Sequence, residues 1–331
     1  MNVRRQHISG VAVAAVTALG LGTLSACSGS AAAGNTEKFD VVASFYPMAY
    51  LAEEIGGDHV NVTSLTEPGQ EPHDLEISAR QTAQLQEADA ALYLKGLQPA
   101  VDEAVAQAGV GTTIDAATLT KLEDHGSLED SHEHAGEEGH AEEEAHSEEE
   151  AHSEEEEHAL DPHVWLDPVK YAEIAKGVGA AFEKADPDHA ADYKKNTAAL
   201  VEKLNGLDSR FEEGLKNTDS KVFFTNHAAF GYLAERYGLT QEAISGLDPE
   251  SEPSPARIKE LQEEAKADGV TTVFYETLVS DSTAKTLAKD AGLKTDVLDP
   301  VEGITGKSEG DDYIQVMDAN LKALQAALGA K

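Results

Sequence analysis

The sequence has a single cysteine, Cys27, and few basic residues. One cysteine excludes an internal disulfide and a zinc site built from several thiolates. Lys and Arg together number 25 against 62 Asp and Glu, and the net charge of −37 excludes nucleic acid as a partner, because DNA and RNA are polyanions. No His-Glu-x-x-His motif occurs, so this signature of a metallopeptidase is absent. We therefore expect a protein that is not an enzyme.

No apolar run is long enough for a typical spanning helix, and this includes the run at the N-terminus. It covers residues 8–24, follows Arg4 and Arg5, and has the pattern of a signal peptide. Leu24-Ser25-Ala26-Cys27 resembles a bacterial lipobox, in which the cysteine is lipidated after cleavage. We expect a lipoprotein signal peptide over residues 1–27 and a flexible tether over residues 28–38. Lipid would then anchor the protein at the outer face of the cytoplasmic membrane.

Residues 123–159 form a segment of unusual composition, with 17 acidic residues and no Lys or Arg. The segment has too few large apolar side chains to form a core, so we expect a disordered insert. Most of its histidines recur every six residues, which advances a helix by about 240° net and does not place them on one face. We interpret them as auxiliary, low-affinity metal ligands, with a solvated acidic spacer as the alternative. They are His125, His132, His134, His140, His146, His152 and His158.

Strand-like and helix-like segments alternate in two series along the chain, which predicts an α/β fold with parallel sheets in two lobes. The predicted strands are residues 39–44, 60–65, 90–94, 112–114, 221–225, 271–275 and 294–298. The predicted helices are residues 47–56, 79–88, 99–108, 229–237, 255–267, 282–291 and 311–328. We expect the N-terminal lobe over residues 39–185 and the C-terminal lobe over residues 218–331.

A long helix is predicted between these lobes, over residues 186–217. From Pro187 onward the segment has no further proline and repeats apolar residues at helical spacing. A helix of this length spans roughly 43 Å at about 1.5 Å per residue. We therefore expect a rigid connector that runs along both lobes rather than a flexible hinge.

Five histidines remain outside the signal peptide and the insert, and three of them lie on loops that precede predicted helices. A proline stands immediately before His73 and before His163 and stiffens each loop, while His227 directly follows an apolar strand. Such connections form the binding crevice of α/β sheets, so we expect the three side chains to share one ligand. His59 and His189 have no comparable context.

Three imidazoles favour zinc, which is usually bound by four ligands in a tetrahedron. The fourth ligand is then a carboxylate or water. Asp299, which follows the last predicted strand, is our first choice. Glu276 is the competitor, either as a ligand or as a partner that orients a histidine.

Several motifs occur in the order found in a known family. They are EPHDLEIS (71–78), DPHVWLDP (161–168), NHAAFGYLAERYGL (226–239), EPSPARI (252–258) and a C-terminal LDP. Over residues 39–328 the chain resembles the zinc-uptake solute-binding proteins of ABC transporters, of the ZnuA and AdcA type.

The resemblance implies two (β/α)4-like lobes bridged by a rigid helix, with the metal at their interface. It implies that His73, His163 and His227 are metal ligands, that Zn²⁺ is the transported ion, and that the partner is the permease of an ABC importer. We expect a monomer. Manganese-binding relatives typically have glutamate at the third position, so His227 favours zinc over Mn²⁺.

Three alternatives stay open at this point. The first is a manganese receptor of the same family. The second is an extracellular zinc buffer or adhesin that holds metal through the insert. The third is a zinc hydrolase with Glu276 as its general base, which requires an open coordination position on the metal.

Overall fold

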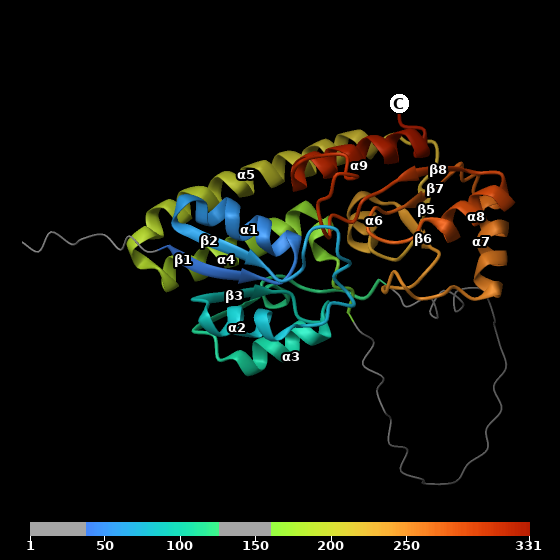
Figure 1. Ribbon diagram of the computed structural model, residues 1–331. Coiled ribbons are helices and arrows are strands. Elements are labelled where there is room, and N and C mark those ends of the chain that lie inside the picture. The colour runs from blue at the N-terminus through green and yellow to red at the C-terminus, as the bar shows by residue number, and fades with distance from the viewer. Residues whose placement is uncertain (1–37, 126–159) are drawn as a thin grey trace, which may run out of the picture. The chain divides into compact units, whose positions relative to one another are not determined.

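Two four-stranded parallel sheets form the framework of the computed structural model, which describes residues 38–125 and 160–331 (Figure 1). The predicted signal peptide with Cys27, the predicted tether up to residue 37, and residues 126–159 of the predicted insert (123–159) lie outside the described residues. So do six of the insert histidines, His132, His134, His140, His146, His152 and His158. Within the described ranges, no helix combines the length and the apolar character needed to cross a bilayer.

The first sheet, which with its helices we call the N-terminal lobe, has the strand order β2-β1-β3-β4. Its strands are β1 (Phe39–Ala43), β2 (Val60–Ser64), β3 (Ala90–Tyr93) and β4 (Thr112–Asp115), and its helices are α1 (Tyr46–Gly56), α2 (Ala79–Glu87) and α3 (Pro99–Ala108). In β1, Val41 and Ala43 pack into the core that contains α1, whereas Val42 packs into the core formed with α2 and α3. A strand buried on both faces needs consecutive apolar residues, which explains the run Val41-Val42-Ala43.

The second sheet, in the C-terminal lobe, repeats this topology with the order β6-β5-β7-β8. Its strands are β5 (Val222–Thr225), β6 (Thr240–Ala243), β7 (Thr272–Tyr275) and β8 (Lys294–Val297), and its helices are α6 (Gly231–Tyr237), α7 (Pro255–Ala267), α8 (Ser282–Ala291) and α9 (Tyr313–Leu328). The neighbours Phe223 and Phe224 in β5 enter cores on opposite faces of the sheet. Because all strands are parallel, the loops that follow them emerge at one edge of the sheet.

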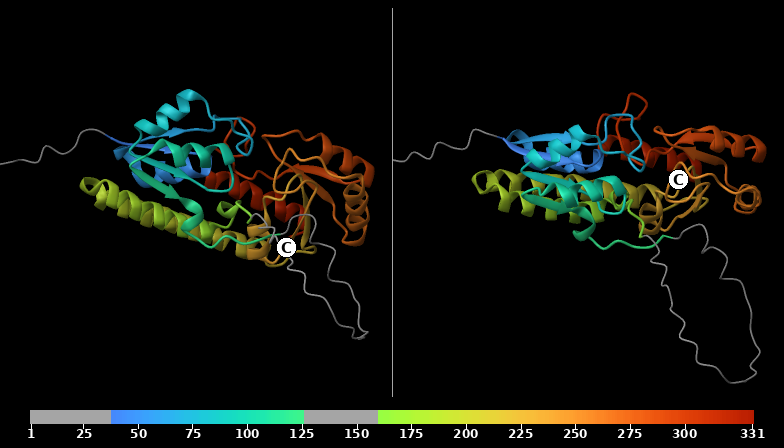
Figure 2. Two further views of the ribbon diagram at one scale, coloured as in Figure 1. Left: turned by 90° about the horizontal axis from the view of Figure 1, so that it is seen from below. Right: turned by 60° about the horizontal axis from the view of Figure 1, so that its bottom comes forward.

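Helices α4 (Pro168–Ala185) and α5 (Ala190–Leu215) connect the lobes. Helix α5 packs on α4, on α1 of the N-terminal lobe, and on α6 and α9 of the C-terminal lobe, as Figures 1 and 2 show. Its 26 residues span about 39 Å at about 1.5 Å per residue. The buried stripe of α5 belongs to one core that continues into both lobes, and it consists of Tyr193, Leu200, Leu204, Leu207, Phe211 and Leu215. A core shared in this way makes α5 a stiff connector.

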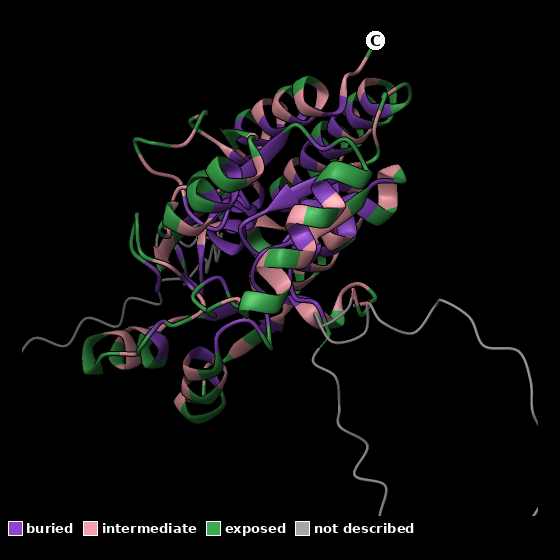
Figure 3. Ribbon diagram, turned by 90° about the vertical axis from the view of Figure 1, so that its right-hand side faces the viewer, coloured by how far each residue is buried: buried purple, intermediate pink, exposed green. Residues whose placement is uncertain are grey.

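Burial follows the layers of the fold. Figure 3 shows buried residues concentrated on the strands and on the inner faces of the helices, with exposed residues on the outer faces. Helices α2, α4, α7 and α9 are each capped by the side chain of the residue before the helix. Asp167 accepts a hydrogen bond from the backbone of Val169 at 2.8 Å, and Ser254 caps α7 in the same manner.

The predicted α/β fold with two parallel sheets and a long helix is confirmed. Two elements were not predicted, α4 and β6. Strand β6 is a short edge strand with the polar sequence Thr-Gln-Glu-Ala, so it lacks the apolar pattern by which strands are recognised. Helix α5 begins at Ala190, because Pro187 lies in a separate 3-10 turn, Pro187–His189.

Candidate metal centre

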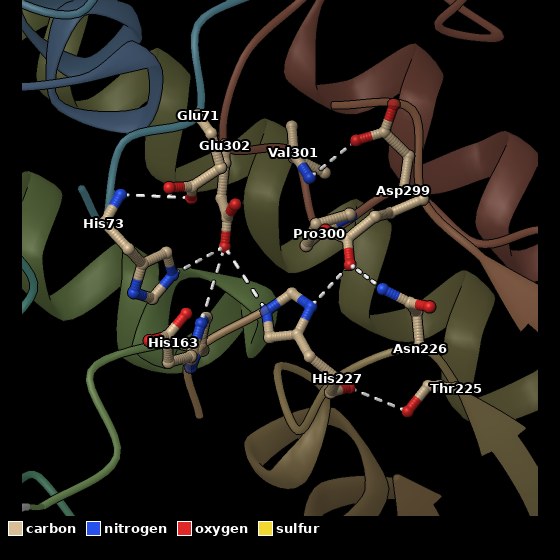
Figure 4. A network of polar contacts seen from close by, with 12 residues as sticks. Glu71, His73, His163, Thr225, Asn226, His227, Asp299, Pro300, Val301 and Glu302 are labelled. Atoms are coloured by element: carbon tan, nitrogen blue, oxygen red, sulfur yellow. Dashed lines mark hydrogen bonds and ion pairs between the residues drawn. The ribbon is translucent and has the colours of Figure 1, made fainter. Parts of the chain in front are cut away.

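Four side chains from separate loops converge between the two lobes (Figure 4). His73 lies in the loop from β2 to α2, His227 in the loop from β5 to α6, and Glu302 in the loop from β8 to α9. His163 immediately precedes a 3-10 turn, Val164–Leu166, that leads into α4. Three of these loops follow the carboxyl ends of parallel strands, where α/β sheets place their ligands.

The Oε1 atom of Glu302 lies in the middle of this group. It is 3.3 Å from Nε2 of His73, 3.4 Å from Nε2 of His163 and 3.7 Å from Nε2 of His227. His163 and Glu302 are fully buried, and His227 is 2% exposed. Nε2 of His163, Nε2 of His227 and Oε2 of Glu302 are buried without a hydrogen-bond partner among the described residues. Buried polar atoms normally have partners, so this group is suited to a ligand that supplies them.

The spacing of the four atoms fits a tetrahedral zinc ion. Zinc binds imidazole nitrogen and carboxylate oxygen at about 2.0–2.2 Å, and donors at the corners of such a tetrahedron are roughly 3.3–3.5 Å apart. The contacts of Glu302 fall at or near this range, and all four ligand atoms lie within 4.8 Å of one another. Small adjustments of the rings are enough to complete the tetrahedron.

Two carboxylates set the orientation of the buried rings. Oδ1 of Asp161 lies 2.8 Å from Nδ1 of His163, and Oε1 of Glu276 lies 2.7 Å from Nδ1 of His227. In each ring Nδ1 donates a hydrogen bond to a carboxylate. Nε2 of the same ring, once deprotonated, therefore has the lone pair that can bind a metal. Both Nε2 atoms face Glu302. Glu276 therefore occupies the place predicted for a partner that orients a histidine.

Burial and charge act in opposite directions on protonation within the group. Burial by itself would raise the pKa of Glu302, but the three imidazoles around its carboxylate hold this pKa well below its usual range. Burial would lower the pKa of His163, but Asp161 and Glu302 raise it. Burial is likewise outweighed by Glu276 and Glu302, which raise the pKa of His227 to about 10. A metal ion that binds here must displace protons from the imidazoles.

Asp299, predicted as the fourth ligand, lies outside the group, and Glu302 takes the place expected for it. The carboxylate of Asp299 accepts hydrogen bonds from the backbone N–H of Val301 at 2.8 Å and from the hydroxyl of Ser308 at 3.0 Å. The hydroxyl of Thr277 donates a third at 3.2 Å. These contacts direct Asp299 into its own loop (Figure 4), so the prediction for this residue is corrected.

The turn at Val301 explains why Glu302, and not Asp299, reaches the centre. Val301 has a φ of 58°, which is rare for a β-branched residue and costs about 1–3 kcal/mol. The indole N–H of the fully buried Trp165 donates to the carbonyl of Pro300 at 2.8 Å and holds the turn from the other side. The position of Glu302 therefore depends on a contact between segments 135 residues apart.

Asp161 was missed as a functional residue, although the sequence contains a signal for it. An acid stands two residues before both His73 and His163, in Glu71-Pro72-His73 and Asp161-Pro162-His163. Each acid accepts a hydrogen bond from the backbone N–H of its histidine, at 3.0 Å for Glu71 and 2.9 Å for Asp161. Glu302 was missed because nothing local distinguishes it from the other acids that follow β8.

The remaining described histidines lie apart from the centre. His59 and His189 stack on each other with ring centroids 4.1 Å apart, and they contact Asp192 and Asp186, respectively. His125, predicted as an auxiliary ligand, lies in a second cluster with Glu123 and Glu235.

The fold and the centre together define a two-lobed binding protein with an ion-sized group of four donors between the lobes and a rigid helical connector. The chain belongs to the family described as "Zinc-uptake complex component A periplasmic", ZnuA, which matches residues 41–327. The family resemblance inferred from the sequence motifs is confirmed.

Three relatives illustrate the similarity. The zinc-binding lipoprotein AdcA of Streptococcus pneumoniae serotype 4 is 38% identical over 308 residues, 91% of this chain, which spans only 58% of the length of that protein. The high-affinity zinc uptake system protein ZnuA of Bacillus subtilis is 34% identical over 318 residues, 93% of this chain and 94% of that protein. The crystal structure of the Zn(II)-bound ZnuA-like domain of Streptococcus pneumoniae AdcA matches with a TM-score of 0.70 and 35% identity, over 88% of this chain and 99% of that one.

Proposed function

We propose that this protein is an extracytoplasmic receptor that binds Zn²⁺ tightly and delivers it to an ABC importer. The observation that carries the proposal is the convergence of three imidazole Nε2 atoms on one buried carboxylate oxygen. In this role Zn²⁺ is the cargo, and its ligands are His73, His163, His227 and Glu302. Family membership and the zinc-related names of the relatives support the choice of metal.

The donor set favours zinc over manganese. Imidazole nitrogen suits zinc, whereas Mn²⁺ prefers oxygen donors and usually six of them. The centre offers three nitrogens and one carboxylate, all within 4.8 Å of one another, which is a small site for a tetrahedral ion.

The same geometry supports binding without catalysis. Four protein donors fill a tetrahedral site and leave no position at which a metal-bound water could attack a substrate. Glu276, the candidate general base of a hydrolase, is engaged by His227 at 2.7 Å and by the amide of Asn226 at 3.1 Å. With Glu276 buried at 4% exposure, a substrate has no direct access to it.

The predicted signal peptide and the family support a proposal for location and partner. We propose that lipid on Cys27 anchors the protein at the outer face of the cytoplasmic membrane and that a single chain docks on the permease. The lipoprotein name of the AdcA relative supports this anchoring. Because one core joins both lobes through α5, we expect metal release through movement of the ligand loops rather than bending at a hinge. The permease must then favour the open loops, since a partner shifts a conformation only through differential affinity.

A competitive titration with Zn²⁺ and Mn²⁺ tests the proposal on the mature chain, Ser28 to Lys331. We expect one tight zinc site, with Mn²⁺ binding at least ~100-fold more weakly because three of the four donors are nitrogens. Comparable affinity for both ions would favour the manganese receptor. Only weak, multiple binding of zinc would instead favour an extracellular buffer or adhesin that holds metal through the insert.

A further inference from the structure

A second group of donors lies beside the metal centre. Ligand atoms of Glu123, His125 and Glu235 fall within 4.8 Å of one another. Glu123 and His125 belong to the first three residues of the predicted insert, at the end of the N-terminal described range, and Glu235 lies on α6. The side chain of Glu235 is 60% exposed and that of His125 is 14% exposed, so the group is open to solvent, unlike the buried centre.

The orientation of His125 repeats the arrangement found in the centre. Oδ2 of Asp161 lies 2.8 Å from Nδ1 of His125, and Oδ1 of the same carboxylate lies 2.8 Å from Nδ1 of His163. Asp161 thus orients two imidazoles at once, and each ring presents Nε2 to a further carboxylate. For His163 this is Glu302 at 3.4 Å, and for His125 it is Glu235 at 3.0 Å. A carboxylate on one ring nitrogen, with further carboxylates at the other, is typical of a metal-binding histidine.

Tyr232 holds the second group in place. Its hydroxyl accepts a hydrogen bond from the backbone N–H of Glu123 at 2.8 Å and donates one to the carbonyl of Asp161 at 2.8 Å. Its ring meets the ring of His125 edge to face, with centroids 4.2 Å apart. The position of His125 is therefore set by contacts from α6 and from the segment before α4.

We propose that Glu123, His125 and Glu235 form a second, solvent-accessible site for Zn²⁺ or a similar first-row divalent ion, linked to the centre through Asp161. This inference rests on the proposed function and specifies where a second ion is held. The site is weaker than the centre, because it offers three protein donors and water must complete the coordination. Lys170 lowers its affinity further, since its ammonium group lies 3.0 Å from Oε1 of Glu123. Its place at the start of the predicted insert suits it to receive ions from the histidines that follow in the sequence.

Isothermal titration of the full mature chain tests the second site. The six insert histidines that follow His125 are replaced by glutamine in the background chain, so that weak binding there does not mask other events. We expect two zinc-binding events, and Glu235→Gln weakens only the weaker one, by at least ~10-fold, since a neutral amide is a poor zinc ligand. Glu235 is chosen because its replacement leaves in place both Asp161, which orients His163, and His125, which shares Asp161 with His163. Glu213→Gln, an exposed carboxylate on α5, is the matched control and leaves both events unchanged.

Two results would overturn the second site. One is a background chain that shows the tight event alone, and the other is a weaker event that Glu235→Gln does not alter. Anomalous diffraction at the zinc edge, from crystals grown with excess zinc, gives a direct check: a peak beside Nε2 of His125 supports the site, and an occupied centre with no such peak overturns it. Failure of the proposed function is distinguishable, because it appears as loss of the tight event in the unmodified chain.

Discussion

Oε1 of Glu276 lies 2.7 Å from Nδ1 of His227, and this contact determines which ring nitrogen faces the metal centre. We expect Glu276→Gln to weaken zinc binding by about 10–100-fold, as is usual when the partner of a metal-binding histidine is altered. Competition with a zinc chelator measures the change. Glu250→Gln, an exposed carboxylate of the same lobe, serves as the control and retains full affinity. Unchanged binding by Glu276→Gln would show that the contact has no part in holding the metal.

Replacement of Glu302 separates the two carboxylates that follow β8. Removing a ligand costs at least as much as removing the partner of one, so we expect Glu302→Gln to reduce zinc affinity by roughly 100-fold or more. Glu309→Gln, in the same loop and exposed, retains the affinity of the unmodified protein. Circular dichroism of each variant confirms that the fold is kept. Tight zinc binding by the Glu302→Gln variant would contradict the role of Glu302 and favour Asp299, the fourth ligand expected from the sequence.

Zinc affinity is expected to rise with pH. The pKa of His163 is raised, and that of His227 is raised to about 10, so protons compete with zinc for both rings up to a higher pH than for an ordinary imidazole. Zinc must displace these protons, whereas Glu302 is already ionised and releases none. The dissociation constant should therefore fall by about 10-fold per pH unit for each proton displaced between pH 6 and 8.

Calorimetry in buffers of different ionisation enthalpy counts the protons released on zinc binding. At least one per zinc is expected at pH 7.5, and the count should fall only as the pH approaches the raised pKa values of the rings. An affinity that stays flat from pH 7.5 to 5 would contradict a site built from three histidines.

The shared core of α5 makes a stability prediction. Leu207 is fully buried on α5 within the core that joins both lobes. Leu207→Ala should lower the free energy of unfolding of the metal-free protein by about 2–5 kcal/mol, through lost burial and the cavity left behind. Urea denaturation followed by fluorescence and by circular dichroism measures this. Asn205→Ala, exposed on the same helix, should change the free energy by no more than about 0.5 kcal/mol. Separate transitions for the two lobes would contradict a common core.

Removal of the insert tests whether the centre is independent of it. The four proposed ligands lie in the described lobes, so deletion of residues 126–159 should leave the tight zinc site intact and remove only weak binding. Titration of both chains at equal protein concentration measures the difference. Loss of tight binding with the insert would make the extracellular buffer the better account.

Most of the fold could be predicted from local patterns in the sequence. Residues 41–43 are apolar in succession because β1 is buried on both faces, and α5 shows its core stripe as a helical repeat of apolar residues. Helix α7 begins at the predicted residue because Ser254 and Pro255 form a standard N-terminus. Strand β6 could not be predicted, since a polar edge strand is stabilised by its neighbour β5 and not by its own composition.

The sequence by itself determined which three histidines come together, because each stands on a loop whose place is set by the strand or helix beside it. Only the tertiary structure decided the fourth donor. Asp299 and Glu302 are three residues apart on one loop, and which of them faces the histidines depends on the positive φ of Val301 and on the distant indole of Trp165. A choice made by contacts between remote segments leaves no local pattern, so it becomes visible only when the chain has folded.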